Sequence, residues 1–170
     1  MAARCAVIGV GNTILSDEGA GVHLVNRMQA RWQCSPQVDF VAAGTSGLQV
    51  ADMMAGYGSV ILLDTIISDK PPGTVLVVAK EQLLQPEPAQ GLAGHAVGLK
   101  KAIELARIQG TVPVNLVLVA IVPALIAFGE TLSAQVEAAM KQYESVTLAL
   151  MQTMGITAAR KQGVQKNGAE

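Results

Sequence analysis

The chain has 170 residues, with 12 Lys and Arg against 13 Asp and Glu, so its formal net charge is -1 at pH 7. This balance provides neither a basic field for nucleic acid nor a polybasic patch for anionic lipid, and no stretch approaches the roughly 20 consecutive apolar residues of a membrane helix. Hydrophobic residues make up 51% and aromatic residues only 3%, which indicates an aliphatic sheet covered on both faces. We therefore expect one cytoplasmic domain with a small site or a protein partner.

The N-terminal segment predicts a strand, a polar turn and a helix. The apolar run Cys5 to Val10 has the length of a strand, and the segment from about Gly19 to Trp32 has apolar residues at helical spacing. Asp17 and Glu18 lie in the turn between them. Because ligands of open α/β sheets bind outside the carboxyl ends of the strands, we expect chemistry near this acid pair.

A second predicted strand, Val38 to Val41, is followed by the loop Gly44-Thr45-Ser46-Gly47. Ser46 and Gln49 fit a capping box that opens a helix to about Gly56. The same loop also has the features of a binding loop, because a helix start presents backbone N–H groups beside the hydroxyl group. The sequence leaves both interpretations open.

The third predicted strand, Ser59 to Ile67, is the most apolar, yet Asp64 interrupts it. A charged group is rarely fully buried without a partner. Asp64 therefore either marks the carboxyl end of the strand or pairs with another group.

The rest of the chain alternates strands and helices. The turn before the strand Thr74 to Ala79 is too short for a crossover helix, so this strand should be antiparallel and at an edge. His95 lies between glycines in the longest aperiodic stretch, Gln85 to Gly98, and such long loops are usually functional or mobile. The remaining elements are a helix over 97–109, a strand over 114–122, a helix with its N-cap at Ser133, and a disordered tail over 155–170. Neither cysteine lies in a CxxC motif, so we expect free thiols.

This order predicts a three-layer α/β/α domain over residues 1–154, with a mainly parallel five-stranded twisted sheet and one antiparallel edge strand. Right-handed crossovers place the first and third strands side by side or one apart. We therefore expect Glu18 and Asp64 to converge.

Three common motifs fail. The dinucleotide fingerprint has Ile14 at its third glycine position and lacks an acid after the second strand. The phosphate loop GxxxxGK[ST] is absent, and GTSG is one residue short of the GxSxG elbow. Glu18, Asp64 and His95 then remain as an O,O,N donor set that suits a divalent first-row metal such as nickel, zinc or manganese.

The segment GVGNTILSDEGAGV, from residue 9, resembles the N-terminal signature of the nickel-iron hydrogenase maturation endopeptidases. GTSG, ILLDTI and GHAVGL match later landmarks of that family in order and spacing, so the resemblance covers about residues 4–154. It differs in one place, because the family usually has an Asp two residues before GT, where this chain has Ala42.

The resemblance implies a peptidase that removes the C-terminal extension of a hydrogenase large subunit precursor after nickel insertion. It implies Glu18, Asp64 and His95 as the metal ligands and the residues of the active site. The ligands either only position the scissile bond, or the metal also polarises its carbonyl or activates water. The residues expected to contact the substrate are Asp17, Gly44, Thr45, Ser46 and Gly47.

We expect the substrate to supply the nickel, so that the protein purifies without metal or with a surrogate divalent ion. The expected partner is the large subunit precursor, with no nucleic acid, no membrane and a monomeric enzyme. A non-catalytic nickel-binding or docking protein for the same precursor is the alternative, and a nucleotide-binding α/β domain is a more distant one.

Overall fold

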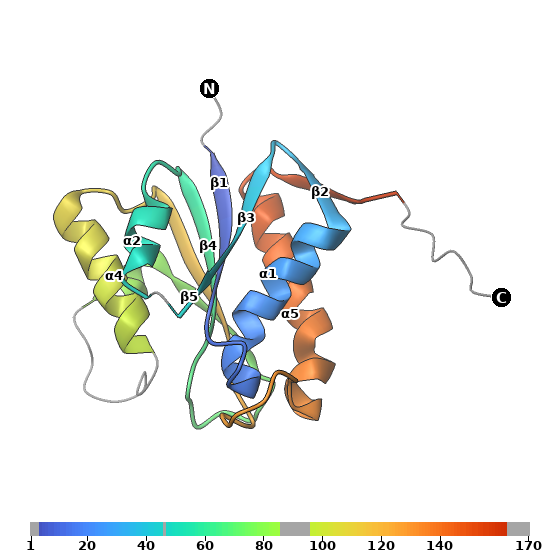
Figure 1. The fold of residues 1–170 in the computed structure, drawn as a ribbon. Helices are drawn as coiled ribbons and strands as arrows, with labels where there is room; N and C mark the ends of the chain where they lie inside the picture. The colour runs from blue at the N-terminus through green and yellow to red at the C-terminus, as the bar shows by residue number, and fades with distance from the viewer. Residues whose placement is uncertain (1–3, 46, 86–95, 163–170) are drawn as a thin grey trace.

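A computed structural model describes residues 4–45, 47–85 and 96–162. They form a three-layer structure around a five-stranded sheet with the strand order β3-β1-β4-β6-β5 (Figure 1). The strands of this sheet are β1 (Cys5–Val10), β3 (Val38–Gly44), β4 (Ser59–Thr65), β5 (Val75–Ala79) and β6 (Asn115–Ile121). All neighbouring pairs are parallel except β5 with β6. The predicted fold, including its antiparallel edge strand, is confirmed.

Helices cover both faces of the sheet, as Figure 1 shows. On one face lie α1 (Ala20–Arg31) and α5 (Ala134–Thr153), and on the other lie α2 (Gln49–Met54) and α4 (Ala96–Gln109). A single turn, α3 (Lys80–Leu83), follows β5, and the 3-10 helix η1 (Ser16–Gly19) precedes α1. None of the helices in the described ranges is long and apolar enough to cross a membrane.

The central strands carry apolar side chains on both faces because each face has its own core. In β4, Ile61 and Leu63 pack in the core beneath α1 and α5. Val60 and Leu62 pack in the core beneath α2 and α4. This alternation explains the unbroken apolar runs of the sequence, since a strand buried on both sides has no polar face.

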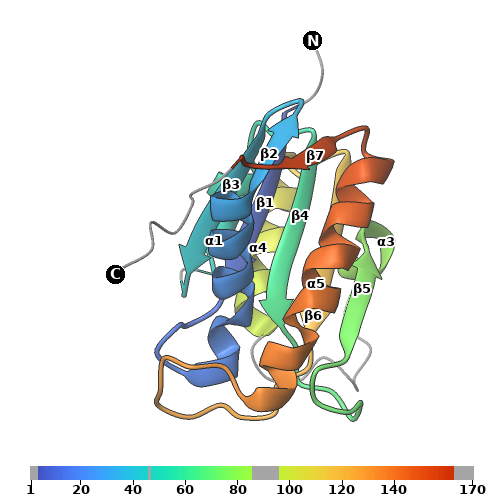
Figure 2. The ribbon, with the colours of Figure 1, turned by 90° about the vertical axis from the view of Figure 1, so that its right-hand side faces the viewer.

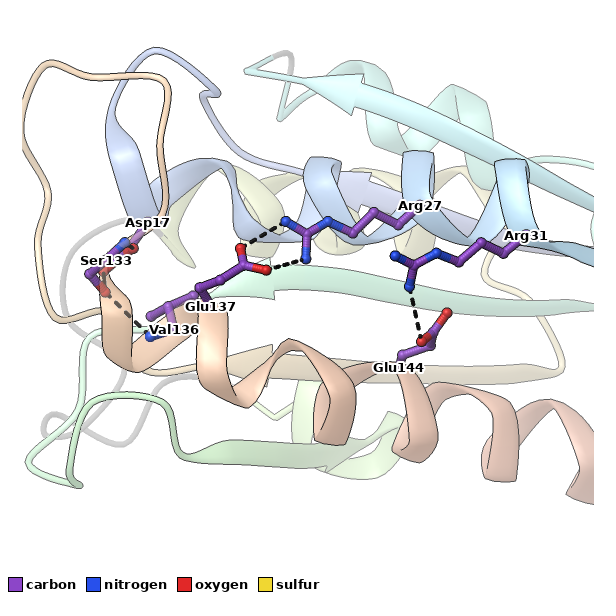
Figure 3. A network of polar contacts seen from close by, with 7 residues as sticks. All are labelled: Asp17, Arg27, Arg31, Ser133, Val136, Glu137 and Glu144. Carbon is purple, nitrogen blue, oxygen red and sulfur yellow. Dashed lines mark hydrogen bonds and ion pairs between the residues drawn. The ribbon is translucent and has the colours of Figure 1, made fainter. Parts of the chain in front are cut away.

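Polar contacts join α1 to α5 along their length (Figure 3). The Arg27 guanidinium donates two hydrogen bonds to the Glu137 carboxylate, both 2.8 Å. Arg31 lies 3.6 Å from Glu144, which also accepts a 2.8 Å hydrogen bond from the Trp32 indole. Ion pairs as well as apolar packing therefore hold α1 against α5.

The structure contradicts the expectation that a disordered tail begins at residue 155. Residues Thr157–Arg160 form β7, which pairs antiparallel with β2 (Trp32–Ser35) in a separate two-stranded sheet. Ile156, just before it, is buried in the core. The pairing partners are far apart in the sequence and neither has an apolar period, so local pattern could not reveal them. Residues 163–170, the rest of the expected tail, lie outside the described residues.

Two smaller expectations concern helix starts and thiols. Ser133 caps α5 as predicted, because its Oγ accepts a hydrogen bond from the Val136 N–H. The capping box predicted at Ser46 lies outside the described residues. Both Cys5 and Cys34 are free, as expected, and burial raises the pKa of the Cys5 thiol to about 11.

Candidate functional site

The turn after β1 lies tightly against the sheet because glycines permit close backbone contacts. A Cβ on Gly21 would overlap the carbonyl oxygen of Leu63 in β4, so α1 begins directly on the end of that strand. Gly11 has a φ of +130°, and a Cβ there would overlap the carbonyl oxygen of Glu18. Both positions require glycine. The glycines of the GVGNTILSDEGAG segment therefore place η1 at the carboxyl edge of the sheet.

The ends of β1 and β4 lie side by side at this edge, which is the lower edge in Figure 2. The Thr65 hydroxyl donates a 2.9 Å hydrogen bond to the backbone carbonyl of Asp17. This contact joins the residue after Asp64 to the residue before Glu18. The structure thus brings the two predicted acids together.

Glu18 and Asp64 are both buried, with 9% and 5% of their surfaces exposed. Burial raises the pKa of Asp64 to about 7, a hydrogen bond from the Thr65 N–H opposes this rise, and the negative charge of Glu18 adds to it. Two carboxylates that interact in a poorly solvated place repel each other. Such a pair is a suitable place for a cation.

Tyr143 of α5 is hydrogen bonded to the backbone of Asp64. It is fully buried, and its hydroxyl lies 3.1 Å from the carbonyl oxygen of Asp64 and 3.0 Å from that of Val119 in β6. Burial raises the pKa of this phenol well above its usual value, so it acts as a donor to the strand ends. No local pattern in the sequence predicts these hydrogen bonds of Tyr143, because they join α5 to strands far away in the chain.

Asp17, adjacent to Glu18, is completely buried and has a different environment. Its carboxylate accepts hydrogen bonds from the backbone N–H groups of Ala124 and Leu125, both 2.9 Å. It also accepts from the N–H (2.7 Å) and the hydroxyl (2.8 Å) of Ser133, which lies beside it in Figure 3. Because a fully enclosed side chain cannot touch a substrate directly, these contacts favour an anchoring role over the expected substrate contact.

The GTSG loop lies at the same edge, after β3. Gly44 has a φ of +60°, and its carbonyl accepts a 3.0 Å hydrogen bond from the Gly11 N–H. Gly47 lies against Gly98 in the first turn of α4, because a Cβ on Gly47 would come within 3.1 Å of the Gly98 Cα. Thr45 is exposed. The loop therefore joins the η1 side of the edge to the start of α4.

The third expected ligand, His95, and the loop residue Ser46 lie outside the described residues. Within ranges 4–45, 47–85 and 96–162, no three His, Cys, Asp or Glu side chains are grouped so that they could hold a metal. The two carboxylates that the structure does bring together supply hard oxygen donors with a net negative charge, which fits a divalent cation. Ala42, at the usual acidic position of the family, is exposed in β3, and its methyl group has no atom that could bind a metal.

The loop between β6 and α5, residues 122–133, is a part of the site that the sequence did not indicate. It lies beside η1 at the lower edge of Figure 2, and a parallel bridge joins Leu15 to Gly129. The apolar side chains of this loop are notable because several of them are exposed. Their exposure could not be read from the sequence pattern.

Comparison with known proteins gives consistent results. The model of the hydrogenase maturation protease family matches residues 22–150, a range that contains Asp64 and His95 and begins after Glu18. The chain is 30% identical over 169 residues to the hydrogenase 2 maturation protease of Escherichia coli (strain K12), covering 95% of this chain and 98% of that protein. It is 27% identical over 157 residues to the hydrogenase expression/formation protein HupD of Thiocapsa roseopersicina, covering 92% of this chain and 71% of that protein.

A solved structure gives the same result for the fold. The hydrogenase maturating endopeptidase HybD from E. coli is similar with a TM-score of 0.82 and 28% identity, over 93% of this chain and 98% of that chain. The match of the family model over most of the chain, the near full-length relative and the shared fold agree with one another, and the chain therefore belongs to the hydrogenase maturation protease family and is a peptidase.

Proposed function

We propose that this protein removes the C-terminal extension of a nickel-iron hydrogenase large subunit precursor after nickel insertion, and that Glu18, Asp64 and His95 contact the nickel held by that precursor. The observation that carries the proposal is the buried pair of carboxylates at the ends of β1 and β4. Membership of the protease family supports a peptidase rather than a non-catalytic docking protein. A monomer acting in the cytoplasm is part of the same proposal.

The two carboxylates form a rigid part of this site. The Asp64 backbone is fixed by pairing with β6 and by the Tyr143 hydroxyl, and Glu18 follows the anchored Asp17. Neither free thiol belongs to this part of the protein, since Cys5 begins β1 and Cys34 lies in β2. A site of two acids and one imidazole without thiolate has modest affinity for nickel, so thiolates of the precursor are needed to complete the ligand shell.

The test uses nickel-loaded and nickel-free large subunit precursor. We expect the wild-type protein to shorten only the loaded precursor, measured as a loss of mass. Asp64→Asn keeps the size of the side chain but removes its charge, and it should process the loaded precursor at least roughly tenfold more slowly. Asp69→Asn is the matched control, because Asp69 is an exposed carboxylate in the turn after β4.

Two results would contradict the proposal. Equal shortening of nickel-loaded and nickel-free precursor would show that the protein does not need the nickel to recognise the precursor. Full activity of Asp64→Asn, with a normal melting temperature, would make that carboxylate a structural group.

A further inference from the structure

Four large apolar side chains are exposed on the β6–α5 loop and on the turn before η1. Phe128 is 90% exposed, and Leu125, Ile126 and Ile14 are 50%, 37% and 51% exposed. Three of them belong to the β6–α5 loop and one to the turn before η1. The two segments are joined, because the Gly129 N–H donates a 3.0 Å hydrogen bond to the Ile14 carbonyl. We name these four residues the apolar rim.

The loop that carries the rim is fixed rather than free-standing. The Ser16 N–H donates to the Gly129 carbonyl (2.7 Å), and the Ser16 hydroxyl donates to the Ala127 carbonyl (3.0 Å). The Asp17 N–H donates to the Leu125 carbonyl (3.3 Å), while the Asp17 carboxylate accepts from the N–H groups of Ala124, Leu125 and Ser133. Because these contacts already order the backbone, binding through the rim loses little conformational entropy.

The rim is continuous with the proposed nickel-contacting site. Its loop is hydrogen bonded to residues 14, 16 and 17, and Glu18 comes next in the chain. A protein whose bound metal reaches Glu18 must approach the edge of the sheet at which this loop lies. It therefore meets the rim as well.

The chemistry of the rim selects the kind of partner. Between residues 122 and 133 the only charged side chain is Glu130, so the loop has no basic residue with which to bind an anionic membrane or nucleic acid. An exposed aromatic side chain among aliphatic ones is typical of a protein–protein contact.

We propose that the apolar rim docks the folded surface of the hydrogenase large subunit precursor around its metal site, so that the peptidase holds the body of the precursor and not only its C-terminal extension. This inference rests on the proposed function. It assigns the binding of the precursor to side chains that carry no catalytic chemistry.

The test compares Phe128→Asp with Val114→Asp. Val114 is the matched control, since it is 76% exposed and lies just before β6, at the opposite edge of the sheet. Both side chains are mostly in solvent, so neither change should alter the melting temperature. With nickel-loaded precursor, we expect Phe128→Asp to lower kcat/KM at least roughly tenfold through KM, with kcat unchanged. Val114→Asp should behave as wild type.

Binding of immobilised nickel-loaded precursor is measured in parallel, so that docking and cleavage are read separately. If wild type cleaves and both variants have its KM and affinity, the docking inference is wrong and the proposed function stands. If wild type binds without cleaving and only Phe128→Asp loses binding, the inference stands and the proposed function fails. If wild type neither binds nor cleaves, both fail. Analytical sedimentation tests whether the rim instead binds a second copy of this protein. A wild-type dimer that Phe128→Asp dissociates, without a change in precursor binding, would overturn the inference.

Discussion

Replacement of Asp17 should weaken the fold more than replacement of its neighbour Glu18. In Asp17→Ala, four donors lose their acceptor: the N–H groups of Ala124, Leu125 and Ser133, and the Ser133 hydroxyl. Taking about 1 kcal/mol for each lost hydrogen bond, the free energy of unfolding should fall by about 4 kcal/mol. Against a typical total of about 5–15 kcal/mol, this is a large fraction.

Asp17→Asn offers a graded version of the same change. An amide has one accepting oxygen and one NH2 group, which cannot accept. The least damaging orientation of the amide puts its NH2 at the position of Oδ1, because only the Ser133 N–H donates to that oxygen. The free energy of unfolding of this variant should therefore fall by about 1.5–3 kcal/mol. Glu18→Gln should unfold close to wild type, because it removes a negative charge that repels Asp64.

Urea unfolding of the three variants, followed by circular dichroism, measures these differences. The expected order of stability is Glu18→Gln, then Asp17→Asn, then Asp17→Ala. An Asp17→Ala protein within about 1 kcal/mol of wild type would refute the anchoring role and return Asp17 to the group of substrate-contacting residues.

Three further predictions concern the site and its support. Because burial raises the pKa of Asp64 from 3.8 to about 7, the folded state binds this proton more tightly than the unfolded state, so wild type should lose stability as the pH rises from about 4 to about 7. Asp64→Asn should lack this loss and unfold at higher urea than wild type at pH 8; a lower midpoint would contradict it. Gly21→Ala places a Cβ against the backbone of β1 and β4 and should lose roughly 1–3 kcal/mol in urea unfolding. In Gly98→Ala the added Cβ would lie 3.7 Å from the Gly47 Cα, an ordinary van der Waals contact, so this change within helix α4 should be neutral or stabilising; equal effects of the two changes would refute the close-contact argument. His95→Ala should stop the shortening of nickel-loaded precursor in the mass assay without changing the melting temperature, and full activity would remove His95 from the site.

Much of the fold follows from local pattern because strands buried on both faces give unbroken apolar runs. The turn before β5 was too short for a crossover, which correctly made that strand antiparallel. The convergence of Glu18 and Asp64 followed from the handedness of crossovers, since β1 and β4 had to be near neighbours.

The features that the sequence did not reveal depend on contacts between distant segments. Asp17 and Glu18 are adjacent and chemically alike, and only the position of Ser133, at the start of α5, distinguishes their roles. The pairing of β2 with β7 likewise joins short segments without apolar period. The expectations for Ser46 and His95 stay predictions.

Helix α5 has a consequence for how this protein family can diversify. Its N-cap residue, Ser133, is hydrogen bonded to Asp17, and about three turns later the Tyr143 hydroxyl is hydrogen bonded to the backbone carbonyl of Asp64. One helix is thus bonded both to η1, which carries Glu18, and to the end of β4, which carries Asp64. The exposed side chains of the β6–α5 loop can therefore vary to suit a different precursor while the two acids keep their spacing.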